Sequence, residues 1–214
     1  YPMVFFFSDK NKLLNKHDLY YNIYISKTLG GDNMPLLKEE TYTINDIYAL
    51  PEGERAELVD GHMYMMAPPS RKHQKISMEF SSIIREYIRS HKGKCEVYAA
   101  PFAVYLDERS NTYVEPDISV ICDPDKLDDR GCKGAPDWII EIVSPASKQM
   151  DYYTKLFKYR NTGVREYWIV DPSKNQVVVY NFEHGDMEQY TLQDSVKAGI
   201  YKDLSIDFSE INIL

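Results

Sequence analysis

Hydrophobic residues recur at helical spacing in three parts of the chain. The longest begins after Ser70, where apolar side chains return every three or four residues and form one face of an amphipathic helix. That face consists of Ile76, Phe80, Ile83, Ile84, Tyr87 and Ile88. A short helix is predicted to begin at the capping residue Thr43. Another is predicted over residues 149–161 and ends at Gly163, a residue that suits the C-terminal position of a helix.

Strands are predicted by the apolar runs that lie between and after these helices. The first two are joined at Asp60-Gly61, a dipeptide typical of tight hairpins because glycine tolerates the positive φ that such turns require. The predicted strands cover residues 55–59, 62–67, 95–99, 102–106, 114–121, 137–143, 166–170 and 177–181. A polar loop is predicted over residues 123–134. The order of helices and strands predicts a single α/β or α+β domain in which sheet dominates.

Residues 1–33 do not follow this pattern. They are rich in Phe, Lys, Asn, Tyr and Ile, whose codons are all AT-rich, and they end in Gly-Gly-Asp-Asn just before Met34. We interpret this N-terminal extension either as sequence upstream of the true start or as a genuine arm that packs on the domain or on a partner. In both interpretations we expect the chemistry in the domain formed by residues 34–214.

The composition is that of an ordinary globular protein, and the charge narrows the range of partners. The chain has 214 residues, of which 43% are hydrophobic and 27% charged, and its net charge is −8. This charge argues against broad attraction to DNA or anionic membranes but leaves room for a local basic groove. No stretch approaches the roughly 18–20 apolar residues of a membrane-spanning helix. The three cysteines form no CxxC pair, which favours a cytoplasmic location over a disulfide framework or a zinc site.

One glutamate interrupts an apolar run. Glu141 lies within Trp-Ile-Ile-Glu-Ile-Val, which is otherwise suited to a fully buried strand. A buried carboxylate is costly unless it is paired, protonated or bound to a metal. Asp117 follows Glu-Pro and precedes a second apolar strand, Ile-Ser-Val-Ile. Carboxylates on neighbouring strands are ligands that Mg²⁺ prefers, and bound Mg²⁺ lowers the pKa of its water and stabilises charge on a phosphate.

Two further residues have the chemistry needed for metal-assisted phosphodiester cleavage. Lys155 lies four residues after Asp151 and therefore on the same helical face. Its ammonium would orient the attacking water or neutralise the developing charge. Glu57, in a short predicted strand, would support a ligand or a second metal. Each residue also has a structural alternative: Glu141 as a paired core residue, Lys155 as an exposed partner of Asp151, Asp117 as a turn cap and Glu57 as a cross-strand partner on a solvated face.

Possible substrate contacts lie on the two longer helices, at the start of the first and near the end of the second. Arg71 and His73 belong to a small basic cluster, Ser-Arg-Lys-His-Gln-Lys, that could contact a phosphate backbone. Tyr159 lies four residues after Lys155 and could line the same site. The alternative for the basic cluster is a solvated helix face, and the alternative for the tyrosine is packing.

Five sequence blocks, taken together, resemble a known bacterial family. They are ELVDG, EPDISVI, GAPDWIIEIVSPAS, DYYTKLFKY and GVREYWIVDP, in the expected order. The set is similar to the Uma-two-type restriction endonuclease family of the PD-(D/E)XK nuclease superfamily, over about residues 43–214. The resemblance implies a restriction-endonuclease-like fold, with a mixed central sheet flanked by helices and extra C-terminal β-hairpins. It also implies a Mg²⁺ site at Asp117, Glu141 and the backbone carbonyl of Ile142, with Glu57 as the acidic residue from the N-terminal part.

One position departs from the superfamily pattern. A lysine is expected two residues after the second acid, where this chain has Val143. The resemblance implies that the lysine comes instead from the following helix, which gives the role to Lys155. Its long, flexible stem allows the ammonium to reach the same place from a different backbone position.

We therefore predict a Mg²⁺-dependent endonuclease, with Mn²⁺ as a substitute, that hydrolyses phosphodiester bonds in nucleic acid, and we expect DNA as the substrate. A homodimer is expected because cleavage of two strands calls for two centres, and no membrane association is expected. One alternative is a catalytically inactive nuclease-fold module that acts through a nucleic-acid or protein partner. Another is a metal-dependent hydrolase of a different substrate. The chain has no P-loop, GxSxG or HExxH motif, which weakens other enzyme classes.

Overall fold

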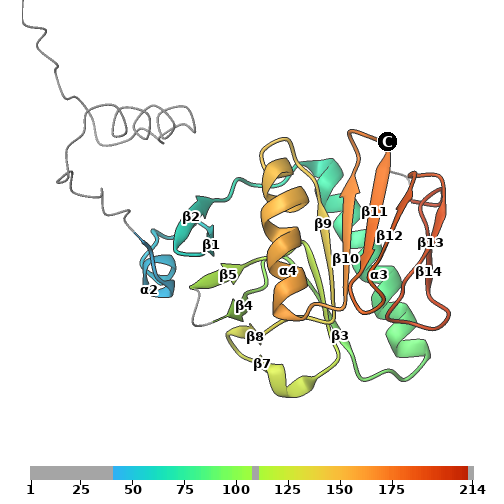
Figure 1. Cartoon of the computed structure of the whole chain (residues 1–214), viewed down its shortest axis with the longest axis horizontal. Helices are drawn as coiled ribbons and strands as arrows, with labels where there is room; N and C mark the ends of the chain where they lie inside the picture. Colours follow the sequence, from blue (N-terminus) through green and yellow to red (C-terminus); the bar gives the residue numbers. More distant parts are fainter. Residues whose placement is uncertain (1–40, 108–110, 212–214) are drawn as a thin grey trace, which may run out of the picture. The chain divides into compact units, whose positions relative to one another are not determined.

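The computed structural model of the chain describes residues 41–107 and 111–211. The predicted extension at residues 1–33 and the predicted boundary at Met34 lie outside the described residues. Figure 1 shows a mixed sheet with a helix on each of its faces, a second sheet beside it, and a hairpin ribbon near the end of the chain. None of the described helices is both long enough and apolar enough to cross a membrane.

The central sheet has the strand order β12-β11-β10-β9-β6-β3. Its strands in chain order are β3 (Glu96–Ala99), β6 (Ile118–Ile121), β9 (Trp138–Ile142), β10 (Glu166–Asp171), β11 (Gln176–Asn181) and β12 (Asp186–Tyr190). The neighbours β9 and β10 are parallel, and every other pair in this sheet is antiparallel. A parallel pair needs a crossover connection, and here the crossover is the second long helical segment. The predicted mixed central sheet is therefore confirmed.

The two helical segments cover opposite faces of this sheet (Figure 1). Helix α3 (Arg71–Ser90) is capped by Ser70 and packs its predicted apolar face against Trp138, Ile140 and Ile142 of β9. The other face is covered by η3 (Met150–Lys155), a π-helical turn, which continues into α4 (Leu156–Thr162). Because side chains alternate along a strand, the odd-numbered positions of β9, including Glu141, face η3 and α4.

The second, N-terminal sheet has the order β2-β1-β5-β4-β8-β7. Its strands are β1 (Ala56–Val59), β2 (His62–Met65), β4 (Val104–Asp107), β5 (Thr112–Val114), β7 (Leu127–Asp128) and β8 (Gly131–Lys133). The remaining elements are α2 (Ile44–Tyr48), the 3-10 turn η2 (Pro124–Lys126), and the two-stranded ribbon β13 (Ser195–Lys197) with β14 (Ser205–Asp207). The hairpin predicted at Asp60-Gly61 is confirmed, since both residues have positive φ, 52° and 79°. The expected C-terminal hairpins are also present.

Two sequence predictions about strands are wrong. The strand predicted over residues 114–121 is divided at Pro116, which has no N–H to donate to a ladder, so that β5 belongs to the N-terminal sheet and β6 to the central sheet. The loop predicted over residues 123–134 contains β7 and β8. The hairpin needs glycine at position 131, because the Cβ of any other residue there would lie 2.2 Å from the Ala103 carbonyl oxygen. The division at Pro116 places Asp117 where the chain passes from one sheet to the other.

The cysteine pattern also differs from the prediction, because Cys95 and Cys122 form a disulfide with an S–S distance of 2.06 Å. They are 27 residues apart, and the antiparallel register that places Glu96 opposite Ile121 makes them the next facing pair. Sequence spacing alone does not reveal this register. Cys132 is free and buried. The argument from unpaired thiols no longer supports a cytoplasmic location, which stays a prediction.

Thiol titration should detect this disulfide. We expect the denatured chain to show one free thiol, that of Cys132, and to show three after reduction. Because the bond closes a loop of 27 residues, Cys95→Ser should lower the free energy of unfolding by about 3 kcal/mol under non-reducing conditions. Urea denaturation with and without reductant measures the change. Three free thiols in the unreduced chain would contradict the disulfide.

Candidate active site

A cluster of carboxylates around one lysine lies where the two sheets meet. Its members come from β1 (Glu57), the residue before β6 (Asp117), β9 (Glu141), and η3 (Asp151 and Lys155). We call these five residues, which are far apart in the sequence, the carboxylate cluster. Three of the carboxylates lie around Lys155, and the fourth residue, Asp117, is connected to them by a hydrogen bond from its backbone N–H to Glu141.

Lys155 is the cation at the centre of the carboxylate cluster. Its Nζ lies 2.8 Å from Glu57 Oε1, 2.9 Å from Glu141 Oε1 and 3.8 Å from Asp151 Oδ1, and its side chain is only 5% exposed. The residue closes η3, and π-helical turns are rare and frequent at functional sites. The turn places both Asp151 and Lys155 in the interior, so the interpretation of Lys155 as an exposed partner of Asp151 is wrong.

Glu141 is held from three directions. One carboxylate oxygen, Oε1, accepts hydrogen bonds from Lys155 Nζ at 2.9 Å and from the Tyr159 hydroxyl at 2.8 Å. The other oxygen, Oε2, accepts the backbone N–H of Asp117 at 3.3 Å. The sequence indicates Tyr159 as a possible substrate contact, but the side chain is fully buried in the structure. The hydroxyl therefore positions Glu141 from the interior and does not face solvent.

Asp117 lies at the more open side of the cluster. Its Oδ2 accepts the backbone N–H of Ile142 at 2.7 Å and lies 3.1 Å from His73 Nε2. Asp117 and Glu141 therefore hold each other in place. The Glu141 side chain accepts the N–H of Asp117, and the Asp117 side chain accepts the N–H of Ile142, the residue after Glu141. The Asp117 side chain is 17% exposed, so solvent reaches this carboxylate.

His73 connects the start of α3 to the site. Burial would lower the pKa of its ring, but the hydrogen bond and charge of Asp117, together with a backbone hydrogen bond to Ile142, raise the pKa above its ordinary value. Its side chain is 15% exposed, so the solvated alternative for this residue is wrong. Arg71, two residues earlier, is exposed and forms no ion pair with a described residue.

The carboxylates of the cluster outnumber its cations. Burial raises the pKa of Glu141 well above its usual value, and the charges of Asp151, Asp117 and Glu57 add to this rise, against the lowering effect of Lys155. Burial likewise raises the pKa of Asp151 to about 6. Burial would lower the pKa of Lys155, but the surrounding carboxylates raise it well above its usual value. The cluster therefore favours additional positive charge.

The fit of this cluster to a divalent cation rests on its donor set. Among the described residues, no group of three or more His, Cys, Asp or Glu side chains is arranged to hold a metal. Mg²⁺, however, is commonly held by one or two carboxylates together with carbonyl oxygens and waters. Asp117 and Glu141 meet that requirement, and Asp151 Oδ1 is a buried acceptor without a hydrogen-bond partner in the described structure. The residues fit a two-carboxylate site.

A second layer of polar contacts supports Glu57. Its Oε1 accepts the backbone N–H of Glu115 at 2.9 Å, as well as the ammonium of Lys155. The side chain of Glu115 accepts hydrogen bonds from the Tyr113 hydroxyl at 2.6 Å and from Arg55 Nε at 2.8 Å. These contacts fix the position of β1 against β5. Glu57 is consequently a buried partner of Lys155, and the solvated cross-strand interpretation is wrong.

The structure thus brings together Glu57, Asp117, Glu141 and Lys155, with His73 beside Asp117 and Tyr159 beneath Glu141. It also adds Asp151, which sequence reasoning treated only as a helical neighbour of Lys155. The signal that could have identified it is the four-residue spacing to Lys155, in a helix that follows a buried carboxylate strand.

Comparison with known proteins identifies the family. A model of the Uma2 family, described as "Putative restriction endonuclease", matches residues 43–208. The chain belongs to the Uma2 family. The resemblance inferred from the five sequence blocks is therefore confirmed, and the family's description supports a nuclease-type hydrolase that acts on nucleic acid.

Two relatives of this Uma2 chain show how far the likeness extends. "Uncharacterized protein slr1290" of Synechocystis sp. is 26% identical over 129 residues, which are 60% of this chain and 66% of that protein's length. A crystal structure described as "a putative nuclease belonging to DUF820", from Anabaena variabilis ATCC 29413, superposes with a TM-score of 0.65 at 21% identity. It covers 79% of this chain and 96% of the other. The predicted fold class is confirmed by this match.

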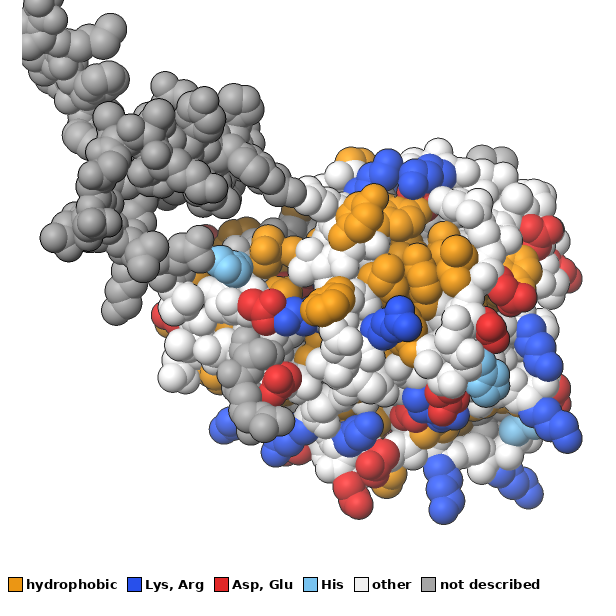
Figure 2. All heavy atoms as spheres, viewed as in Figure 1, with side chains coloured by type: hydrophobic (Ala, Val, Ile, Leu, Met, Phe, Trp, Pro, Cys, Tyr) orange, Lys and Arg blue, Asp and Glu red, His pale blue; other side chains and the backbone are white. Residues whose placement is uncertain are grey.

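The outer side of α4 carries exposed aromatic residues. Figure 2 shows hydrophobic side chains gathered over α4 and the adjacent strands β10 and β11. The exposed large hydrophobic residues of the segment formed by η3 and α4 are Tyr153, at 73%, and Phe157, at 65%. The same helix turns Lys155 and Tyr159 inward, so its inner side belongs to the carboxylate cluster and its outer side faces solvent.

Proposed function

We propose that this Uma2-family chain is a Mg²⁺-dependent endonuclease that hydrolyses phosphodiester bonds in DNA, with Mn²⁺ able to replace Mg²⁺. The observation that carries the proposal is the convergence of Asp117, Glu141 and Lys155, with the ammonium 2.9 Å from the Glu141 carboxylate and Asp117 bonded to the next residue of β9. This combination of two acids and a lysine suits phosphoryl transfer, in which positioning and charge stabilisation supply most of the catalysis.

The ion would be held by Asp117, Glu141 and the backbone carbonyl of Ile142. When bound, it would supply Lewis-acid stabilisation of the phosphate and a water of lowered pKa. The chain's own residues keep these ligands in place: Tyr159 and Lys155 fix Glu141 Oε1, which leaves Oε2 directed toward Asp117. Buried hydrogen-bonding partners of this kind hold metal-binding carboxylates in a fixed orientation.

Lys155 is proposed to act on the attacking water or on the charge that develops on the phosphate. Its ammonium is already desolvated and held by Glu57 and Glu141, so it would need no reorganisation during the reaction. His73 is proposed to hold the Asp117 carboxylate in position, because its Nε2 already lies 3.1 Å from Asp117 Oδ2 and its Nδ1 is buried. Arg71 lies on the same first turn of α3 and would contact the neighbouring backbone.

Cleavage of supercoiled plasmid tests the proposal. The full chain is expected to nick or linearise the plasmid in Mg²⁺ or Mn²⁺, and EDTA is expected to abolish cleavage because the ligands would lose their ion. Gel electrophoresis over a time course gives the rate. Cleavage that persists in EDTA would contradict the metal dependence, and an absence of cleavage with either ion would contradict the nuclease proposal.

One observation favours the catalytically inactive module as a second candidate. Lys155 already neutralises part of the carboxylate cluster at distances of 2.8 and 2.9 Å, as it would in a site that does not need a metal. Retained binding to DNA without cleavage would support this alternative. The homodimer is also a proposal, since two centres would allow both strands to be cut, and sedimentation equilibrium would give the mass of the assembly.

A further inference from the structure

One segment of this acidic chain carries a clear net positive charge. Residues 71–94 contain seven Lys or Arg against two Glu, a net charge of +5 in a chain whose net charge is −8. The segment comprises α3 and the turn that leads to β3. The rest of the protein is therefore strongly acidic, and a segment of net positive charge is a place where a polyanion would be attracted.

The cations lie on the side of α3 that faces away from the core. With 3.6 residues per turn, four of these positions fall on one side of the helix, opposite the buried Ile76, Phe80, Ile84 and Ile88, and the fifth lies in the turn that follows Ser90. We call this set the basic stripe: Arg71, Lys75, Arg85, Arg89 and Lys92. None of its members forms an ion pair with any residue in the described parts of the chain, so their charges are available to a ligand.

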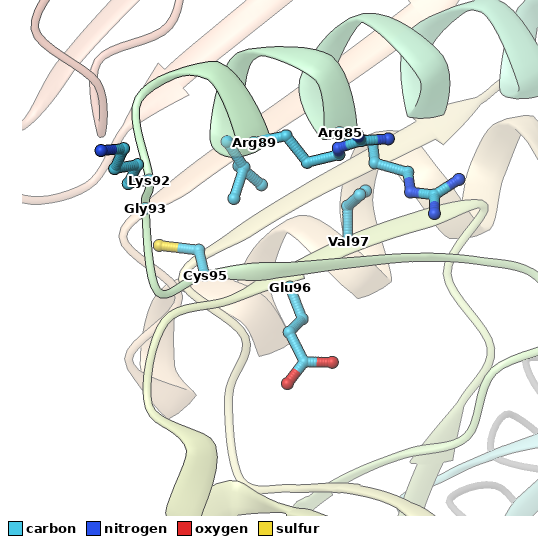
Figure 3. A pocket seen from close by; sticks show the side chains of 8 residues that line it. Arg85, Arg89, Lys92, Gly93, Cys95, Glu96 and Val97 are labelled. Atoms are coloured by element: carbon cyan, nitrogen blue, oxygen red, sulfur yellow. The ribbon is translucent and has the colours of Figure 1, made fainter.

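The C-terminal end of the basic stripe borders a recess. Arg85, Arg89 and Lys92 line one side of a shallow hollow of about 460 Å³, and Cys95, Glu96 and Val97 of β3 line the other. Figure 3 shows the side chains of Arg85 and Arg89 above the strand, while the Glu96 side chain points to the opposite side. Glu96 instead bonds with the hydroxyl of Tyr98, which leaves the helix side of the recess to the cations.

The strand beneath this recess is an edge. β3 is the last strand of the central sheet and pairs only with β6 among the described strands. Backbone N–H groups on a free edge can donate to phosphate oxygens, as can arginine and lysine side chains. Basic side chains and free backbone donors therefore lie together along the same surface.

The other end of the stripe reaches the carboxylate cluster. Arg71 and Lys75 lie in the first turns of α3, as does His73, whose ring lies 3.1 Å from Asp117, but they project from the other side of the helix. A helix of this length extends about 30 Å at 1.5 Å per residue, so the stripe leads from the site to the recess. A backbone that passes the end of α3 nearest the site and continues along the outer side of this helix would meet these cations in succession.

We propose that the basic stripe binds the sugar–phosphate backbone of the nucleic acid whose scissile phosphate is held at the carboxylate cluster, an inference that rests on the proposed function. The stripe neutralises several phosphates outside the site and confers affinity without reading the base sequence. It also explains how a chain of net charge −8 can hold a polyanion.

Charge reversal at the recess end tests this proposal. The triple variant Arg85→Glu, Arg89→Glu, Lys92→Glu is compared with the unaltered chain for binding to a fluorescently labelled duplex in EDTA, where no metal-dependent cleavage occurs. Its affinity at about 100 mM salt should fall at least about tenfold. The slope of log affinity against log salt should become shallower by about 2 to 3, because each lost phosphate contact removes about 0.9. Fluorescence anisotropy measures both quantities.

A matched variant separates location from net charge. Arg130→Glu, Arg160→Glu, Lys197→Glu changes the same residue types and the same total charge at exposed positions outside α3. It should retain affinity within about threefold, since distant charges are screened at this salt concentration. Equal loss in both triple variants, an unchanged salt slope, or no binding by the unaltered chain would each overturn the proposal. Binding that depends on the stripe without any cleavage would overturn the nuclease proposal alone.

Discussion

Replacing Asp117 with asparagine is expected to reduce plasmid cleavage in Mg²⁺ by at least about 100-fold, comparable to the loss of one strong charge-stabilising group in other enzymes. Asparagine keeps the shape of the side chain and can still accept the Ile142 N–H that Asp117 Oδ2 accepts at 2.7 Å. It removes the negative charge that a divalent ion requires. The rate of plasmid cleavage gives the effect on activity, and calorimetric titration with Mn²⁺ should show a parallel loss of metal affinity.

Asp137→Asn is the matched control for this prediction. Asp137 also accepts a backbone N–H, that of Cys122 at 2.7 Å, and also contacts a cation, Arg165, at 3.1 Å, but it lies at the other end of β9. The control variant should cleave at a rate close to that of the unaltered chain. If the two asparagine variants cleave equally, Asp117 has no special role and the proposed centre is wrong.

Replacing Lys155 with methionine is expected to lower the free energy of unfolding by about 3–5 kcal/mol, because it leaves buried carboxylates without their partner cation. Three carboxylates lose that partner: Glu57, Glu141 and Asp151. Methionine fills a similar volume, so the charge and not the packing is the main change. Urea denaturation followed by the fluorescence of the buried Trp138 and Trp168 measures the loss, and plasmid cleavage should be lost as well.

Lys158→Met provides the comparison on the same helix. Lys158 pairs with Asp60, whose side chain is 52% exposed, and surface pairs of this kind contribute about 1 kcal/mol or less. The double variant Lys155→Met, Glu141→Gln should recover part of the lost stability, since the two residues are in contact and their effects are coupled. Equal destabilisation by Lys155→Met and Lys158→Met would show that Lys155 does not neutralise the carboxylate cluster.

Local sequence signals were sufficient for the elements whose form depends on neighbouring residues. The apolar spacing of α3, its start after Ser70 and the Asp60-Gly61 hairpin are all set by interactions within a few residues, and each is present. Pro116 is a local signal too, but its effect depends on which sheet each half of the predicted strand joins. That choice is made by long-range pairing, which a single sequence does not display.

The burial of Glu141 could be predicted from its apolar neighbours, while its partners could not. The sequence by itself determined the types of residue available, the helices and hairpins, and, through the five family blocks, the pairing of Asp117 with Glu141. Only the tertiary structure decided that Tyr159 turns inward onto Glu141, that Asp151 joins the cluster, and that Cys95 faces Cys122. The physical reason is that strand register and the π-helical turn fix side-chain directions, and these directions are determined by the packing of the whole domain.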